Sequence, residues 1–198
     1  MKSKLLSAAS SVLLLSSGVS AATIDTSALN HLEVVNELPG WSFEVNSLGT
    51  ENKMTFIDTF REIPGDPDLM AMVGEAFIIQ DGRKVGDEAK GGTITLKFDR
   101  EFSRLSSSLI DVEEVSTVSI LDADGLVLFT ESFQTDDGEV SGFEWHGEGG
   151  KSFRVTLGGS GAFTVPDFDP VPEPSTILLT SLFLFVFSNR TRKGTIQW

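Results

Sequence analysis

Apolar and polar residues alternate with a period of two in the central part of this chain. At 93–99 the sequence reads TITLKFD, with Ile94, Leu96 and Phe98 on one face and Thr95 and Lys97 on the other. Successive side chains of a β-strand point to opposite sides of a sheet, so this period predicts a strand with one buried face. No long helical period occurs outside the two termini. The chain is therefore predicted to fold as an all-β domain.

Turn residues divide the pattern into short strands. Asp124-Gly125 predicts a hairpin between two of them, and Asp137-Gly138 and the glycine-rich stretch 147–150 are typical of further turns. Other strands are predicted at 41–45, 115–121, 126–133, 142–145 and 152–157. Roughly eight to ten strands at this spacing indicate an antiparallel β-sandwich, jelly-roll-like, flanked by an N-terminal signal helix and a C-terminal hydrophobic helix.

The last 28 residues differ from the rest of the chain. Prolines at 172 and 174 keep the first of them extended. An apolar run of 11 residues follows at 177–187, and then a basic cluster of Arg190, Arg192 and Lys193. The run is shorter than the roughly 20 residues of a membrane-spanning helix, but snorkelling basic side chains and local bilayer thinning could close the gap. This order predicts an anchoring or processing signal instead of a core element.

This tail resembles a PEP-CTERM sorting signal. Pro172, Glu173 and Pro174 match the Pro-Glu-Pro motif, and the basic cluster matches the Arg-rich end. Five further residues after Lys193 and a polar pair at 180–181 depart from the usual pattern. In that family a membrane-embedded exosortase is taken to cut near the motif. The resemblance implies an exported protein of a Gram-negative bacterium, anchored transiently in the inner membrane and then delivered to the cell surface or medium.

The other end predicts a secretory signal peptide. Lys2 and Lys4 precede an apolar stretch at 5–15, and small residues lead to Ala21, after which signal peptidase is expected to cut, with Ala22 as the alternative. An exported chain without cysteine has no disulfides, so its fold must rest on burial or on a metal. The predicted organisation is a signal peptide at 1–21, a β-sandwich domain at 22–165, an acidic, proline-containing linker at 166–171, the sorting signal at 172–193 and a tail at 194–198.

Residues 74–168 resemble secreted bacterial β-sandwich domains of jelly-roll or galactose-binding-like type. The stretch 75–114, the DADG turn at 122–125 and the sequence FRVTLGGSGAF at 153–163 carry this resemblance. Some of these modules bind calcium and glycans. The resemblance therefore implies the fold, with calcium and glycans as the ligand classes to examine.

Acidic residues dominate the predicted domain. Between Ala22 and Glu173 there are 10 basic and 29 acidic residues, a net charge of −19, whereas the whole chain carries −14. This charge argues against nucleic acid and anionic membrane surfaces as partners of the domain. It suits a soluble extracellular protein and divalent cations.

Several of the acidic residues are grouped in predicted loops. Asp66 and Asp68 lie in a Pro-Gly loop, Glu88 lies just before a strand, and Asp111 and Glu113 lie at the end of another strand. Calcium takes about six to eight oxygen ligands from loops that can bend around it. These five residues are predicted calcium ligands, with a solvated acidic surface as the alternative interpretation.

Little in the chain points to catalysis. Two histidines and no cysteine leave a zinc-type site without ligands. Ser160 lies in a GGSGA stretch that lacks the last glycine of a nucleophile elbow, and no helical pattern follows it. Trp145, beside a glycine-rich loop, and Trp41 are candidate platforms for sugar rings, with packing as the competing role.

Three functions remain open from the sequence. The first is a non-catalytic surface or matrix protein associated with exopolysaccharide, with signal peptidase and exosortase as processing partners. The second is a calcium-dependent glycan-binding module, and the third is a hydrolase. Exposed aromatic residues on a concave sheet would favour the second function. Two facing carboxylates in a cleft, or Ser160 beside a histidine, would favour the third.

Overall fold

A computed structural model describes residues 22–49, 53–80 and 90–172. This part of the chain contains 11 strands and one short 3₁₀ helix, η1, and no α-helix. In chain order the elements are β1 Ala22–Thr23, β2 Glu33–Val34, β3 Trp41–Ser47, β4 Lys53–Asp58, η1 Pro67–Leu69, β5 Glu75–Gln80, β6 Gly92–Ile110, β7 Ser116–Leu121, β8 Val127–Phe133, β9 Val140–Leu157, β10 Ala162–Thr164 and β11 Asp167–Pro170. The strand pairs run antiparallel, so the predicted all-β, antiparallel class is confirmed.

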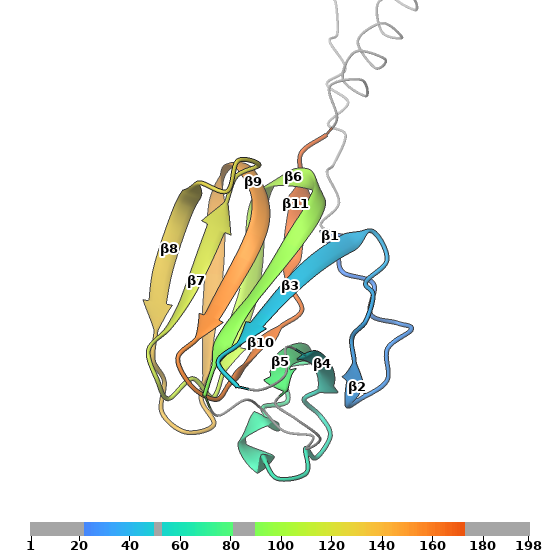
Figure 1. Cartoon of the computed structure of the whole chain (residues 1–198), viewed down its shortest axis with the longest axis vertical. Helices are drawn as coiled ribbons and strands as arrows, with labels where there is room; N and C mark the ends of the chain where they lie inside the picture. The colour runs from blue at the N-terminus through green and yellow to red at the C-terminus, as the bar shows by residue number, and fades with distance from the viewer. Residues whose placement is uncertain (1–21, 50–52, 81–89, 173–198) are drawn as a thin grey trace, which may run out of the picture.

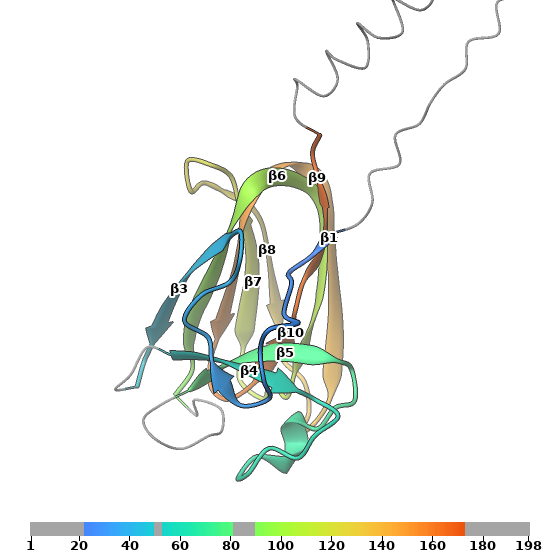
Figure 2. The same ribbon diagram turned by 90° about the vertical axis from the view of Figure 1, so that its right-hand side faces the viewer.

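The strands form one antiparallel sheet that folds over on itself into a sandwich. β6 and β9 pair with each other in both layers and curve over the top of the molecule (Figure 2). The first layer has the order β3–β6–β9–β7–β8 (Figure 1). In the second layer, the other half of β6 lies between the other half of β9 on one side and β10 and β11 on the other. Beyond β10, the layer continues with β5, β4 and β2, in that order. One pair of long strands thus holds the two layers together.

The sheet bends where the register between β6 and β9 shifts. Regular pairing ends at Lys97, resumes at Phe102 opposite Gly150, and shifts again before Arg104. A β-carbon at Gly150 would collide with the Phe102 ring. The bend therefore needs a residue without a side chain opposite the phenylalanine.

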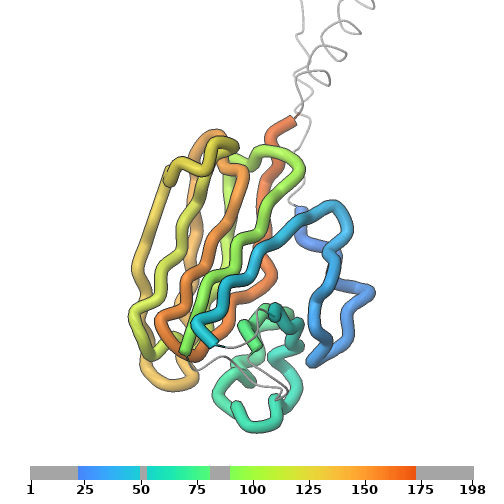
Figure 3. The backbone as a smooth tube through the Cα atoms, in the orientation of Figure 1, coloured from blue at the N-terminus to red at the C-terminus, as the bar shows by residue number. Residues whose placement is uncertain are grey.

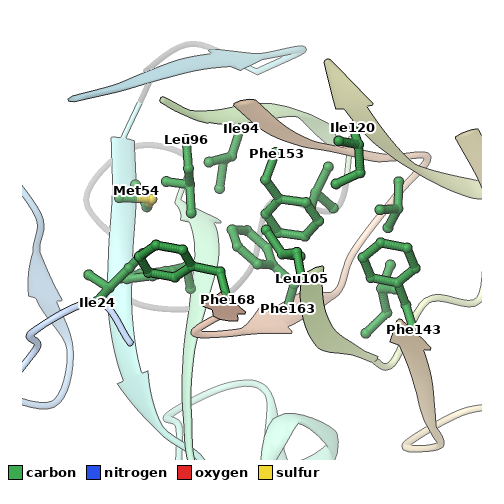
Figure 4. Close-up of a cluster of buried hydrophobic side chains, with 14 of the residues drawn as sticks. Ile24, Met54, Ile94, Leu96, Leu105, Ile120, Phe143, Phe153, Phe163 and Phe168 are labelled. Atoms are coloured by element: carbon green, nitrogen blue, oxygen red, sulfur yellow. The ribbon is translucent and has the colours of Figure 1, made fainter. Parts of the chain in front are cut away.

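The main core lies between the two layers and is rich in phenylalanine (Figure 4). Ile94, Leu96 and Phe98 are 1%, 0% and 3% exposed, which confirms that they share a buried face. Lys97 is exposed on the opposite face, as predicted. Thr95 shares that outer face but is only 6% exposed, and the neighbouring Arg154 donates its Nε–H to the Thr95 hydroxyl at 3.3 Å.

A second, smaller core lies between the outer face of the second layer and the segment 59–73. Thr59 closes this segment, since its hydroxyl accepts the N–H groups of Val73 and Gly74 at 3.0 Å and donates to the Gly74 carbonyl at 2.7 Å. The buried residues of this core are Ile57, Ile63, Leu69, Ala76, Ile78, Ile110 and Ala162. They cover one end of the outer face and leave the rest of it open.

Two expectations about chain organisation are wrong. The predicted strands at 142–145 and 152–157 are present, but the turn expected between them at 147–150 is wrong, because β9 continues through this stretch and pairs with β6 on both sides of the bend. The predicted linker at 166–171 contains β11, which pairs with β6 and β1. Phe168 is 7% exposed and packs against Phe98 with ring centroids 5.0 Å apart, so this segment belongs to the sandwich.

The two ends of the described chain meet at one end of the sandwich. Ala22 pairs with Phe168, and both ends leave near the bend of β6 and β9 (Figures 2 and 3). Over residues 22–172, gaps aside, no helix is long and apolar enough to cross a membrane. Several sequence predictions lie outside the described residues. They are the cleavage site at Ala21, Glu173 and Pro174 of the sorting motif, the hydrophobic helix, the basic cluster at Arg190, Arg192 and Lys193, and the predicted calcium ligand Glu88.

Candidate functional site

An open groove of about 1010 Å³ lies on the outer face of the second layer. Its lining comes from β6, β9, β10 and β11, and from the segments 23–27 and 73–75. The charged residues among them are Asp25, Glu75, Arg104, Glu144 and Asp167. Serine and threonine residues make up most of the remaining polar lining, at Thr23, Thr26, Ser27, Ser106, Ser107, Ser108 and Thr164.

Strand alternation places polar side chains in the groove. In the second half of β6, Leu105 and Leu109 are buried in the core, so Arg104, Ser106 and Ser108 face outward. Glu144 lies opposite Ser106, on the neighbouring β9. The sandwich thus supplies a rigid polar surface from two paired strands.

Gly142 widens the groove. It lies opposite Ser108 on β9, and a β-carbon at this position would meet no atom within 4 Å. Gly142 also has no positive φ. Its lack of a side chain therefore leaves space in the groove and is not required by the backbone.

Arg104 and Glu144 form the central ion pair of the groove. The Arg104 Nε–H donates to Glu144 Oε1 at 2.6 Å, and Nη2 donates to the Ser106 hydroxyl at 3.3 Å. Glu144 raises the pKa of Arg104, and Asp169 and Asp167 add to this effect. The hydrogen bond and charge of Arg104, together with His146 at 3.3 Å, lower the pKa of Glu144. Both groups are therefore charged at neutral pH.

Hydroxyl groups also hold the carboxylates of the groove wall. Asp25 accepts the Ser27 N–H at 3.0 Å and the Ser27 hydroxyl at 2.6 Å, and these bonds lower the pKa of Asp25. Glu75 accepts a hydrogen bond from the Thr26 hydroxyl. Thr26 itself is only 6% exposed. The wall is thus built from residues at the start of the described chain and from the start of β5.

None of these groove residues was singled out from the sequence. The polar positions of the stretch RLSSS at 104–108 were a signal, because alternation predicts that every second residue faces outward. Their partners at 25 and 167 are 142 residues apart in the chain, however. Only the pairing of β1 with β11 and of β11 with β6 brings them to one groove.

The tryptophans do not line this groove. Trp145 is 7% exposed and packs edge-on against Phe102 with centroids 5.6 Å apart, so its indole lies in the core and has no free face for a sugar. Trp41 packs edge-on against Phe98 at 4.2 Å and is half-buried beside a second, smaller hollow. The packing role of Trp145, which the sequence left open, is the one observed.

A group of acidic side chains lies at the end of the sandwich away from the chain ends. The group consists of Asp66 and Asp68 beside η1, Asp111 and Glu113 after β6, and Asp137 in the β8–β9 loop. Within it, neighbouring carboxylates help to raise the pKa values of Asp68, Asp111 and Glu113. A β-carbon at Gly138 would lie 4.0 Å from that of Asp68, which places these two loops in contact. Four of the predicted calcium ligands, Asp66, Asp68, Asp111 and Glu113, are therefore neighbours. Asp137, which was not predicted as a ligand, lies with them.

Asp111 is the best-held member of this acidic group. It is 5% exposed, has a φ of 55°, and its Oδ1 accepts the Gly138 N–H at 2.9 Å. Burial raises the pKa of Asp111, and so do the charges of Asp66, Asp137 and Asp68, whereas the bond from Gly138 lowers it. Partial burial, followed by neighbouring carboxylates, also raises the pKa of Asp68 and of Glu113.

These acidic side chains do not form a ready metal site. Among the described residues, no three His, Asp or Glu side chains are placed so that they could hold one metal ion. Each residue of the group repels the others when ionised. A cation would have to draw the side chains together.

Neither histidine forms a catalytic arrangement with Ser160 within the described residues. His31 is bonded to the Asp58 N–H and the Glu62 carbonyl, and His146 lies beside Glu144. Ser160 makes no hydrogen bond to either histidine. The lowered pKa values of Asp25 and Glu144 leave neither carboxyl protonated near neutral pH, as a general acid would have to be.

No protein family model matches the chain, and no curated protein matches it in sequence. Among solved structures, it is similar to a carbohydrate-binding module of family 29 from Piromyces equi, with a TM-score of 0.41, 11% identity, and coverage of 76% of this chain and 90% of that one. It is also similar to the lectin domain of lectinolysin in complex with Lewis b, with a TM-score of 0.38, 11% identity, and coverage of 70% of this chain and 100% of that one. A fucose-binding module of Streptococcus pneumoniae is similar with a TM-score of 0.37, 10% identity, and coverage of 65% of this chain and 98% of that one. Likenesses of this size do not establish what this chain binds.

Proposed function

We propose that this protein is a non-catalytic, glycan-binding β-sandwich of the cell surface or extracellular matrix, and that the groove around Arg104 binds the glycan. The supporting observation is an open polar groove in which a fixed guanidinium, carboxylates and hydroxyls lie on rigid strands. Sugar hydroxyls both donate and accept hydrogen bonds, so they need acceptors and donors side by side. The groove supplies both, and its volume is that of a typical ligand site.

Arg104 has capacity for a ligand. A guanidinium has five N–H donors, and two are used, toward Glu144 and Ser106, within the described chain. The bond to Glu144 fixes the plane of the guanidinium before any ligand arrives. A preorganised donor loses less side-chain entropy on binding than a free one.

Arg104→Gln tests this role. We expect at least about a tenfold loss of affinity for the bound glycan, because a hydrogen bond to a charged group contributes about 1.5–3 kcal/mol. The measurement is affinity electrophoresis of the full-length protein in gels containing neutral polysaccharides, followed by calorimetry with the glycan that retards it. Arg154→Gln is the matched control, since Arg154 lies on the outer face of the other layer. Equal effects of the two substitutions would exclude the groove as the site.

We propose further that the chain is exported and sorted through its two ends. The PEP motif, the apolar run and the basic cluster support this role, as does the exit of both described ends on one side of the sandwich. Mass spectrometry of the protein from envelope and culture medium should find a mature chain that begins at Ala22 or Thr23 and ends near Pro174. Alanines at 172–174 should trap the protein in the inner membrane, and normal release of that variant would rule out exosortase sorting.

Calcium binding at the acidic end is a second candidate function, favoured by the convergence of Asp66, Asp68, Asp111 and Glu113. The pKa values of Asp68, Asp111 and Glu113 are higher in the folded state than their ordinary values. Without a cation, the folded state therefore loses stability as pH rises from the ordinary carboxyl pKa through the raised pKa, and the loss persists at higher pH. A divalent cation would remove this penalty. Binding to the folded state alone stabilises by about 2.7 kcal/mol at a hundredfold excess over Kd.

Asp111→Asn should therefore act in opposite directions with and without calcium. In chelator the variant should melt at or above the wild-type temperature, because one repulsive charge is gone. In millimolar calcium it should melt several degrees below the wild type, whose melting temperature calcium raises. Asp124→Asn, an exposed change in the β7–β8 hairpin, should leave the calcium response intact. Equal wild-type melting in calcium and chelator would leave these acids as a solvated surface.

A further inference from the structure

The groove carries an excess of negative charge. Its lining contains four carboxylates, Asp25, Glu75, Glu144 and Asp167, and a single cationic side chain, Arg104. The hydrogen-bonded contact with Glu144 at 2.6 Å already offsets the charge of Arg104. The net charge of the lining is therefore −3, on the surface proposed to contact a glycan.

The carboxylates are held where a ligand would meet them. Ser27 holds Asp25, Thr26 holds Glu75, and Arg104 holds Glu144, so three of the four are oriented by neighbours and not by the ligand. Asp25, Glu75 and Asp167 are exposed, and none of them is in an ion pair within the described chain. Arg104 interacts electrostatically with Asp167 without forming an ion pair with it, so the three carboxylates remain available to a cationic ligand.

We propose that the groove selects glycans that carry free amino groups, such as polymers of de-N-acetylated amino sugars. This inference rests on the proposed glycan-binding function and names its ligand class. A sugar ammonium donates up to three hydrogen bonds and pairs with carboxylate, whereas a uronic acid would place a further negative charge among four. The hydroxyls and the spare donors of Arg104 would bind the ring oxygens of the same chain.

The test compares three oligosaccharides of equal length: oligomers of N-acetylglucosamine, of glucosamine and of galacturonic acid. Binding to the full-length protein is measured by calorimetry. We expect the glucosamine oligomer to bind about tenfold tighter than the N-acetylated one at low salt, and the preference to shrink at about 0.15 M salt. The galacturonic acid oligomer should bind most weakly.

Matched variants separate the groove from the general acidity of the domain. Asp167→Asn should lower the affinity for the glucosamine oligomer more than the affinity for the N-acetylated one, and so reduce the preference. Glu131→Gln removes an exposed carboxylate on β8, outside the groove, and should leave the preference intact. Equal losses in the two variants would attribute the preference to overall charge and overturn the inference.

The remaining outcomes distinguish the two levels of the proposal. If the acetylated and free-amine oligomers bind equally and both depend on Arg104, the groove binds glycans but the inference about charge is wrong. Tightest binding of the galacturonic acid oligomer also overturns it. If no glycan binds in a way that depends on Arg104, the proposed function itself fails.

Discussion

Gly142→Trp is expected to abolish glycan binding without unfolding the protein. Gly142 lies in the groove, and its missing side chain leaves open space beside Ser108. An indole there would occupy the volume that the ligand needs, so we expect at least about a hundredfold loss of affinity. The fold should tolerate the change, because tryptophan favours strands and an exposed substitution usually alters stability by about 0.5 kcal/mol or less.

The control for this experiment is the same substitution on the other layer. Thr130→Trp adds an indole to the exposed outer face of β8 and should leave affinity unchanged. Urea unfolding of both variants measures stability, and calorimetry measures binding. Retained affinity in Gly142→Trp, with its stability intact, would show that glycans bind elsewhere or not at all.

Phe153→Ala should lower the free energy of unfolding by about 3–5 kcal/mol. Phe153 is 1% exposed in β9 and lies at the centre of the core (Figure 4). Its ring stacks on Phe143 with centroids 6.0 Å apart and meets Phe163 edge-on at 5.7 Å. Removing it leaves a cavity between layers that this chain, without disulfides, cannot reinforce covalently.

The matched control is Phe60→Ala. Phe60 is 61% exposed in the segment 59–73, so its truncation removes little buried surface. We expect a change within about 0.5 kcal/mol in the same urea unfolding experiment. A loss of similar size in both variants would mean that the core between the two layers is not what stabilises the sandwich.

Local patterns in the sequence predicted the strands but not their ends. The alternation at 93–99 placed Ile94, Leu96 and Phe98 in the core, because the period of two depends only on the local backbone. The hairpin at Asp124-Gly125 is present, and Asp122 holds it by accepting the N–H groups of Asp124 and Leu126. The bend in β6 and β9 was missed, since glycines at 147–150 indicate a turn equally well when the strand continues through them.

The two candidate sites differ in how far the sequence could reveal them. At the acidic end, loop carboxylates such as Asp68 and Asp111 were predicted, because clustered charges are visible along the chain. Asp137 was missed, since its Asp-Gly dipeptide was interpreted as a turn alone. The groove was missed entirely, because its residues look like ordinary surface positions until distant strands place them side by side.

The sequence by itself determined the all-β class, the buried face of the central strand and the acidic character of the domain, because these depend on local periodicity and composition. Only the tertiary structure decided that β6 and β9 pass through both layers, that 167–170 is a strand, and that Asp25, Arg104, Glu144 and Asp167 share one groove. The physical reason is that pairing between strands is a long-range choice. It is made by packing phenylalanines between two layers, and no local pattern records which strands will meet.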